Sequence, residues 1–356
     1  MSSPTGTTAP TPLVIETPED LRRAMGTEHT ASPQQWAAIS APLAPAVVVA
    51  GAGSGKTTLM AARVVHLVLT GQVRPEEVLG LTFTTKAASE LRTRIRDALR
   101  RAGVLGDADA RPGSGAAGEE APDDSLEPTV LTYHAYAAQL LSEHGLLIGH
   151  EPDTRVITDA ARYQLGARVV DGWTGDVKAL SDHPPTVIQN LLALDSAMSE
   201  HLVGPDDVRR VDQEARRGFE RALAEERAGK GRTTWCEPCE KAIHAIDRRA
   251  ELLGLVEGYR RLKAELGLMD FSDQIELAAR LASQQAGVGA AERAKFRVVL
   301  LDEYQDTSVA QAVMLGRLFS GPDEAHGLGH AVTAVGDPNQ AIYGLRGASV
   351  SNILGF

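Results

Sequence analysis

The sequence predicts an α/β fold, in which a parallel sheet built from alternating strands and helices is interrupted by a mainly helical insert. The apolar, β-branched run at residues 46–50 ends in glycines and precedes a helical stretch at 56–70, the pattern of a buried parallel strand and its crossover helix. A second strand at 78–83 and a second helix at 86–101 repeat this alternation. This βαβ rhythm is typical of a doubly wound sheet.

Strand patterns stop over residues 155–268, where Arg, Glu and Ala recur at helical spacing, and they return at 296–301 and 331–335. A helical block therefore interrupts one α/β domain. The composition of 103–128, rich in Gly, Ala, Asp and Pro, indicates a flexible surface insertion. The expected parts are a flexible tail at 1–30, a first α/β part at 31–154, a helical subdomain at 155–268 and a second α/β part at 269–356.

Composition limits the class of protein. A chain of 356 residues with 43% hydrophobic content can bury at least one large core. The first residues lack a signal-peptide pattern, and no run approaches the about 18 apolar residues of a membrane span. Two cysteines fit a reducing compartment, so we expect a cytoplasmic protein without a membrane partner. The net charge of −11 neither supports nor excludes nucleic acid, because binding needs only a local basic groove.

A glycine-rich segment at residues 50–57 fits the phosphate-binding loop pattern, with Ala where the strict form begins with Gly. Its glycines permit a tight turn whose N–H groups face phosphate oxygens, and the following helix adds its positive end. Lys56 suits contact with the β- and γ-phosphates, and Thr57 suits Mg²⁺ ligation. A chance glycine loop is the alternative, which the preceding apolar strand disfavours. The candidate nucleotide-binding residues are Ala50, Gly51, Ala52, Gly53, Ser54, Gly55, Lys56, Thr57 and Thr58.

The apolar strand at 298–301 ends in Asp302 and Glu303, which suit the second half of such a site. Asp302 is expected to hold the water shell of Mg²⁺, and Glu303 to orient the attacking water or accept its proton. A solvated strand end is the alternative for an acidic pair alone. Together with a phosphate-binding loop in the same chain, the pair indicates nucleoside triphosphate hydrolysis.

Six ordered segments resemble the motifs of UvrD/Rep/PcrA-type superfamily-one DNA helicases. They read SPQQ at 32–35, LTFTTKAA at 81–88, TYHA at 132–135, DFSD at 270–273, LDEYQDT at 301–307 and GDPNQAIY at 336–343, the last followed by Arg346-Gly-Ala. The resemblance spans residues 32–348 apart from the helical insert. It implies a RecA-like fold, ATP with Mg²⁺, and single-stranded or duplex DNA as partner.

The resemblance also implies roles for single residues. Gln35 would read the adenine, and Arg63 would lie beside the base. Gln340 would sense the γ-phosphate, and Arg346 would couple that sensing to the DNA surface. The implied DNA contacts are Phe83, Thr84, Lys86, Tyr133, His134 and Tyr343.

Aromatic faces and phosphate donors are what sequence-tolerant binding of one strand requires, although core packing is the alternative for Phe83 and Tyr133. One position departs from the family pattern: Leu345 stands where the family usually has Trp. Because Leu cannot stack on a base as an indole does, we expect a weaker grip on DNA at that step.

The function implied is 3′→5′ movement on DNA in repair or recombination. Two alternatives stay open: the motor part of an AddA/AdnB-like helicase–nuclease subunit with a partner subunit, and a DNA-binding module that does not hydrolyse ATP. Family members place ATP between two RecA-like domains, and nothing after Ala348 corresponds to the second. The chain is therefore expected to stop before that domain and to be weakly active or inactive alone.

Cys236 and Cys239 have the spacing of a metal knuckle or a redox pair. A tetrahedral zinc site needs four ligands, and only His244 and more distant histidines are available to complete it. Two ordinary cysteines near a helix start are the favoured interpretation.

Overall fold

The computed structural model describes residues 13–51, 53–105, 127–229 and 234–340. The chain divides into two compact units, of which the first combines residues 1–139, 282–307 and 312–356 and the second combines 140–281 and 308–311. The predicted flexible insertion falls largely on residues 106–126, outside the described part.

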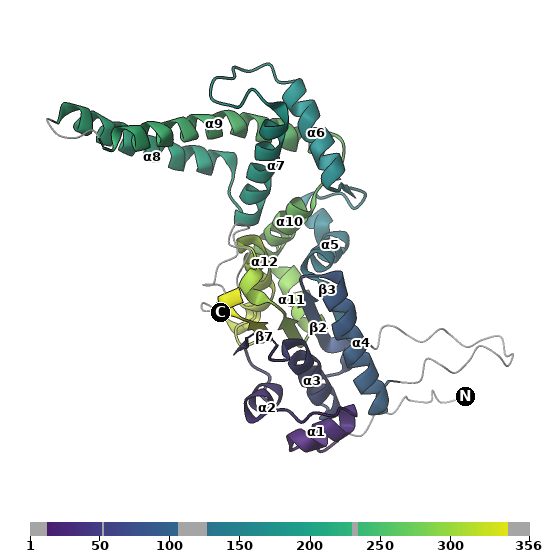
Figure 1. The fold of residues 1–356 in the computed structure, drawn as a ribbon. Coiled ribbons are helices and arrows are strands. Elements are labelled where there is room, and N and C mark those ends of the chain that lie inside the picture. Colours follow the sequence, from purple (N-terminus) through teal and green to yellow (C-terminus); the bar gives the residue numbers. More distant parts are fainter. Residues whose placement is uncertain (1–12, 52, 106–126, 230–233, 341–356) are drawn as a thin grey trace. The chain divides into compact units, whose positions relative to one another are not determined.

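A parallel sheet with the strand order β1–β7–β6–β2–β3 organises the first unit (Figure 1). Its pairings are all parallel, with Val48 opposite Val335 and Leu81 opposite Leu301. This sheet confirms the α/β class predicted from the alternation of strands and helices. The strands are β1 (Ala46–Val49), β2 (Val78–Thr82), β3 (Thr129–Thr132), β6 (Val298–Leu301) and β7 (Ala331–Gly336).

Strand β1 lies at the edge of the described sheet, which differs from the buried strand that its composition predicts. Val47 and Val49 are 39% and 61% exposed, whereas every residue of β6 and β7 is buried. An apolar, β-branched run favours the extended conformation, but its place in the strand order depends on pairing with β7, a segment far away in the sequence.

Helices α1 to α4 pack their apolar faces in a single core with β2, β6 and β7. Helix α1 lies within residues 1–30, so this part of the expected flexible tail is instead a helix with Leu21 and Met25 buried in the core. Helix α3 follows β1 directly and is buried from Leu59 to Leu69, so it fixes the glycine turn that precedes it. The helices are α1 (Pro18–Met25), α2 (Pro33–Ile39), α3 (Lys56–Leu69), α4 (Thr85–Arg101), α5 (Tyr133–His144, continuing into the second unit), α11 (Ala286–Lys295) and α12 (Val309–Phe319).

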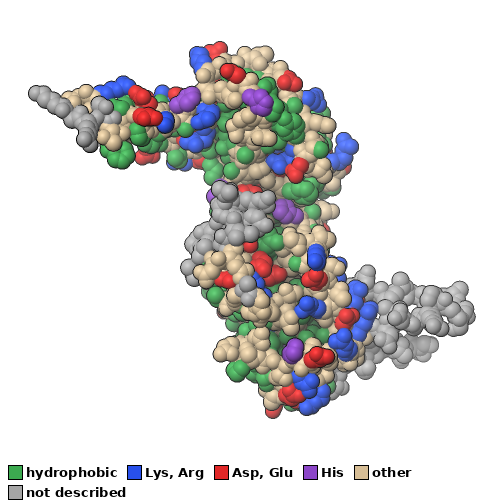
Figure 2. All heavy atoms as spheres, viewed as in Figure 1, with side chains coloured by type: hydrophobic (Ala, Val, Ile, Leu, Met, Phe, Trp, Pro, Cys, Tyr) green, Lys and Arg blue, Asp and Glu red, His purple; other side chains and the backbone are tan. Residues whose placement is uncertain are grey.

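The second unit is mainly helical, and its core is formed by α6, α7 and α9. Helices α8 and α9 run side by side as a long hairpin (Figure 1). Ion pairs such as Arg209–Glu257 at 2.8 Å join them, and Figure 2 shows acidic and basic side chains interspersed along the hairpin. The elements are β4 (Arg155–Val156), α6 (Asp159–Asp171), α7 (Pro184–His201), α8 (Pro205–Ala228), α9 (Cys236–Glu265), β5 (Leu268–Met269) and α10 (Phe271–Gln284).

A buried ion cluster in the second unit contains the DFSD segment. The Lys263 ammonium lies 3.1 Å from Asp195, 3.2 Å from Asp270 and 2.7 Å from Asp273. Asp270 Oδ1 also accepts from the backbone N–H groups of Ser272 and Asp273, which caps the start of α10. Burial raises the pKa of Asp273 to about 6. The segment thus holds α9 to the start of α10.

Among the described residues, no helix is both long enough and apolar enough to cross a bilayer.

Candidate nucleotide site

The glycine turn between β1 and α3 adopts the backbone that its sequence requires. Gly53 and Gly55 have φ of 71° and 82°, in the left-handed region that favours glycine. Gly55 is the N-cap of α3, which begins at Lys56. The unpaired N–H groups of this helix start therefore end at the turn, as an anion site requires. Ala52 lies outside the described residues.

Gln35 connects the start of α2 to this turn. Its Oε1 accepts from Ser32 N at 2.9 Å and its backbone N–H donates to Ser32 Oγ at 3.2 Å, a capping box. Its Nε2 donates to Ser54 O at 3.1 Å. A cavity of about 260 Å³ adjoins Gln35 and is lined also by Leu21, Met25 and Thr58. The predicted adenine reader therefore stands at a cavity beside the phosphate-binding turn.

Lys56 meets the acidic end of β6. Its Nζ donates to Glu303 Oε2 at 2.7 Å, and its side chain is 10% exposed. The two residues are 247 positions apart in the chain. The structure thus brings together the two halves of the site that the sequence placed only separately.

Glu303 has φ of 48°, a strained conformation for a residue with a side chain, of the sort that persists at functional sites. Its backbone N–H donates to Asp302 Oδ1 at 3.0 Å. Burial first, and the Glu303 charge second, raise the pKa of Asp302 to about 6. Two carboxylates held this close repel one another, and a divalent cation between them relieves that repulsion. This donor set, with the Thr57 hydroxyl at the start of α3, fits Mg²⁺.

A polar network extends from Glu303 to the end of β7. Gln305 Nε2 donates to Glu303 Oε2 at 2.8 Å, and Gln305 Oε1 accepts from Asp337 N at 3.0 Å. Gln340 Nε2 in turn donates to Asp337 Oδ2 at 2.7 Å. Gln340 is therefore connected to the acidic pair through two residues, Gln305 and Asp337, to which the sequence analysis gave no role. Gln305 lies inside the LDEYQDT segment and Asp337 inside the GDPNQAIY segment, and their place in these segments is the sequence signal that could have identified them.

Arg63 does not lie at the nucleotide site, which corrects the expectation from the resemblance. Its side chain is 0% exposed, and burial lowers its pKa. Its guanidinium donates to the carbonyls of Ala38, Ile39, Ala41 and Pro42 at 2.9, 3.2, 2.9 and 3.1 Å and to Thr333 Oγ1 at 3.2 Å. These bonds join Arg63 of α3 to the end of α2, to the segment that follows it, and to β7.

Tyr133 is also corrected, because it is 1% exposed and cannot stack on a base. Its hydroxyl donates to Asp302 O at 3.0 Å, and its ring contacts Phe83 with centroids 4.8 Å apart. Phe83 is half-buried at the end of β2. Of the two aromatics, only Phe83 keeps accessible surface for a DNA base.

The other expected DNA contacts are distributed around the same strand ends. Thr84 is exposed, and its hydroxyl accepts from Ala87 N at 3.1 Å at the start of α4. Lys86 is exposed and 3.9 Å from Glu90, and His134 is half-buried at the start of α5. Tyr343 and Arg346 lie outside the described residues.

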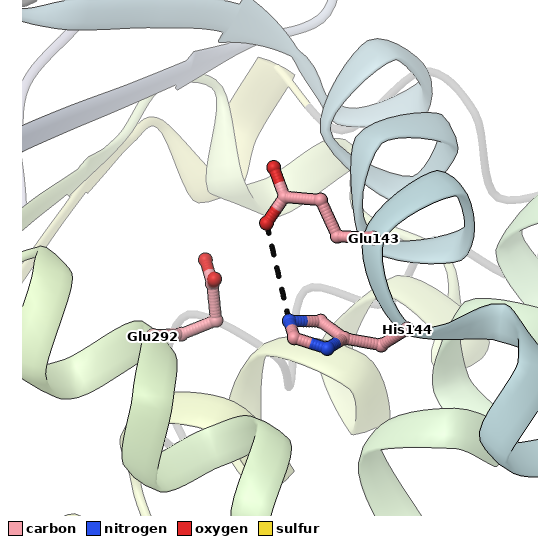
Figure 3. A group of neighbouring side chains, drawn as sticks. All are labelled: Glu143, His144 and Glu292. Atoms are coloured by element: carbon pink, nitrogen blue, oxygen red, sulfur yellow. Dashed lines mark ion pairs between the residues drawn. The ribbon is translucent and has the colours of Figure 1, made fainter.

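Figure 3 draws Glu143, His144 and Glu292, which we do not assign to the nucleotide site. Glu143 Oε2 lies 3.9 Å from His144 Nε2, an ion pair only when the histidine is protonated. In the first unit, Glu292 is buried and accepts from the Tyr136 hydroxyl at 2.7 Å. These contacts have an ordinary structural role.

Comparison with known proteins gives one consistent result. Residues 31–356 match the family model described as the UvrD/REP helicase N-terminal domain. The chain is 28% identical to the ATP-dependent DNA helicase PcrA of Leuconostoc citreum over 91% of its own length and 34% of that protein. It is 29% identical to the ATP-dependent DNA helicases UvrD2 and UvrD1 of Mycobacterium tuberculosis, over 91% of its length and 38% and 35% of theirs. The chain thus spans about a third of the length of the curated relatives it matches.

Proposed function

This chain belongs to the UvrD/REP helicase N-terminal domain family, and on that premise we propose that it is the ATP-binding part of a motor that couples ATP hydrolysis to movement on single-stranded DNA. The observation that carries the proposal is the 2.7 Å contact between Lys56 and Glu303. This contact supports the proposal, because it joins the lysine that we assign to phosphate binding to the carboxylate that we assign to catalysis, at the start of helix α3.

We assign the phosphates, the adenine and the cation to different residues of the site. The glycine turn and Lys56 hold the phosphates, Gln35 faces the cavity that would accept adenine, and Thr57 and Asp302 hold Mg²⁺. When bound, Mg²⁺ neutralises charge on the phosphate oxygens. Burial first, and the charge of Glu303 second, raise the pKa of Asp302, so a divalent cation at these carboxylates would stabilise their charged forms.

Lys56 and Glu303 neutralise one another in the structure. A γ-phosphate entering the turn competes for the Lys56 ammonium, and Glu303 becomes available to orient a water molecule and accept its proton. Gln305 keeps the carboxylate in place, because its amide donates to the same oxygen.

Coupling to DNA follows from Tyr133. Its hydroxyl holds the main chain of Asp302, and its ring contacts Phe83. A shift of the acidic segment on hydrolysis would displace Phe83, the accessible aromatic at the end of β2. We assign base contact to Phe83 and phosphate contact to Lys86.

The experiment is nucleotide titration of the 356-residue chain with a fluorescent ATP analogue. We expect Mg²⁺-dependent binding that Lys56→Ala abolishes and that Glu303→Gln keeps, because Gln retains the shape but cannot accept the proton. A folded chain that takes up no nucleotide in the presence of Mg²⁺ contradicts the proposal.

The finer parts of the proposal concern the whole protein. We infer 3′→5′ movement from the resemblance alone, tested by unwinding of substrates with one tail of either polarity. We also propose that full turnover requires a second RecA-like domain that supplies arginines to the γ-phosphate, since such arginines contribute about 10³–10⁵ in rate in other NTPases. DNA-stimulated hydrolysis by the 356-residue chain at about one per second or faster would refute that dependence.

The helicase–nuclease alternative is tested by the full reading frame, which would encode a nuclease downstream, and by isolation of a partner subunit. A module that only binds DNA is disfavoured, because Lys56 and Glu303 are both present and in contact.

A further inference from the structure

The α8–α9 hairpin carries both cysteines of the chain at one end. Helix α8 ends at Ala228 and α9 begins at Cys236 (Figure 1). The two helices are joined near this end by the ion pair between Arg227 and Glu240, and Trp235 N donates to Glu226 Oε1 at 3.2 Å. Both cysteines therefore lie at the start of a helix that these two contacts fix to α8.

Helix geometry places the Cα atoms of the two cysteines within the separation that disulfides span. Cys236 is the first residue of α9 and Cys239 the fourth, with Cys239 N donating to Trp235 O at 3.0 Å. Residues three apart on a helix share one face, with Cα atoms about 5 Å apart from the rise and radius of the helix. Disulfides span Cα separations of about 4.4–6.8 Å. Pro238 is tolerated because first-turn N–H groups have no helical partner.

The two thiols differ in accessibility. Cys236 is half-buried, whereas Cys239 is 8% exposed, and both are free thiols. Cys236 is therefore the more accessible of the two residues, and Cys239 is the more protected. This is the order that thiol–disulfide exchange needs, because an accessible thiol is attacked first and a protected thiol then closes the ring.

A metal site is disfavoured by the surroundings. Among the described residues, the groups of three or more potential ligands within 4.8 Å of one another do not include either cysteine. Residues 230–233, which lie outside the described part, are Lys, Gly, Arg and Thr, which are not zinc ligands. Two thiolates alone do not complete a tetrahedral zinc site.

We propose that Cys236 and Cys239 form a reversible disulfide by exchange with a low-molecular-weight disulfide. The Cys236 thiolate attacks the small disulfide, forms a mixed disulfide and releases one small thiol. The Cys239 thiolate then attacks the Cys236 sulfur and releases the second. Two electrons and two protons pass from the cysteine pair to the oxidant, which is reduced to two thiols. The helix start is thereby closed covalently at its first turn.

The test is mass spectrometry of the native 356-residue chain after incubation with oxidised glutathione. We expect a loss of two hydrogen atoms without retained glutathione, a cross-linked peptide containing both cysteines, and full reversal by dithiothreitol. Cys239→Ser should retain one glutathione at Cys236, because the residue that closes the ring is missing. Cys236→Ser should react at least about tenfold more slowly than Cys239→Ser, because its remaining thiol is buried.

Several outcomes would overturn the proposal. They are a wild-type chain that keeps glutathione on either cysteine, a chain that does not react until it is denatured, equal reaction rates of the two serine variants, and stoichiometric zinc that either variant loses. Circular dichroism of both variants checks that the hairpin still folds. ATP binding serves as an independent measurement, because the site is in the other unit and should be unchanged by oxidation.

Discussion

Replacing Arg63 by Met separates a structural role from a nucleotide-binding role. Met keeps an unbranched side chain of similar length but removes every donor. Of the bonds that Arg63 makes, those to Ile39 O and Thr333 Oγ1 are in buried surroundings, and the others are partly open to water. An unsatisfied buried acceptor costs about 1–3 kcal/mol.

The two buried acceptors together give an expected destabilisation of about 3–4 kcal/mol for Arg63→Met. For a unit of this size, about 2–4 °C in Tm accompanies each kcal/mol, so we expect a fall of roughly 6–15 °C. Because the side chain is 0% exposed, affinity for the ATP analogue, measured well below the unfolding temperature, should change less than about threefold, since loss of one direct contact costs about tenfold.

The assay is thermal unfolding followed by circular dichroism, with nucleotide titration on the same preparations. Arg94→Met is the matched control, because Arg94 is exposed and donates only to Thr58 Oγ1 at 2.7 Å among the bonds described. Its Tm should stay close to that of the unmodified chain. An unchanged Tm for Arg63→Met together with a tenfold or greater loss of nucleotide affinity would refute the structural role. It would instead indicate that Arg63 contacts the base.

Three further predictions address the site itself. The pKa of Asp302 is raised to about 6 from 3.8, so ionisation of this carboxyl opposes folding and stability is lost as the pH rises from about 4 to about 6. Above pH 6, Asp302→Asn should therefore be more stable than the unmodified chain by up to about 3 kcal/mol. Urea unfolding between pH 4 and 8 measures this difference, and a pH profile of stability that the substitution leaves unchanged contradicts the prediction. Phe83→Ala should weaken binding of single-stranded DNA by about 1–3 kcal/mol at fixed salt, as measured by fluorescence anisotropy. Tyr133→Phe should leave that affinity unchanged and destabilise the fold by about 1 kcal/mol in unfolding measurements. The opposite pattern would indicate that Tyr133, and not Phe83, contacts the base. Gln35→Ala should lower affinity for ATP by about tenfold and leave affinity for GTP unchanged, and an equal loss for both nucleotides would remove its role in reading the base.

Much of the fold and half of the site follow from local sequence. The glycines at 53 and 55 specify a backbone that other residues rarely adopt, and the structure has both at positive φ. The β2 strand and the α3 and α4 helices begin and end within a residue or so of their predicted positions, because period and capping are local properties. The acidic pair was recognisable from the apolar strand that precedes it.

Local sequence therefore predicts the chemistry that we propose for the site: which groups we assign to phosphate, which to a cation, and which strands carry them. The exposure of those side chains followed from the tertiary packing. Arg63 and Tyr133 stand in recognised positions, yet one is enclosed by residues up to 270 positions away and the other by Asp302, 169 positions away. Burial depends on which distant segments pack together, and the edge position of β1 was set in the same way by its pairing with β7. Local patterns specify conformation, but exposure is a property of the packed core.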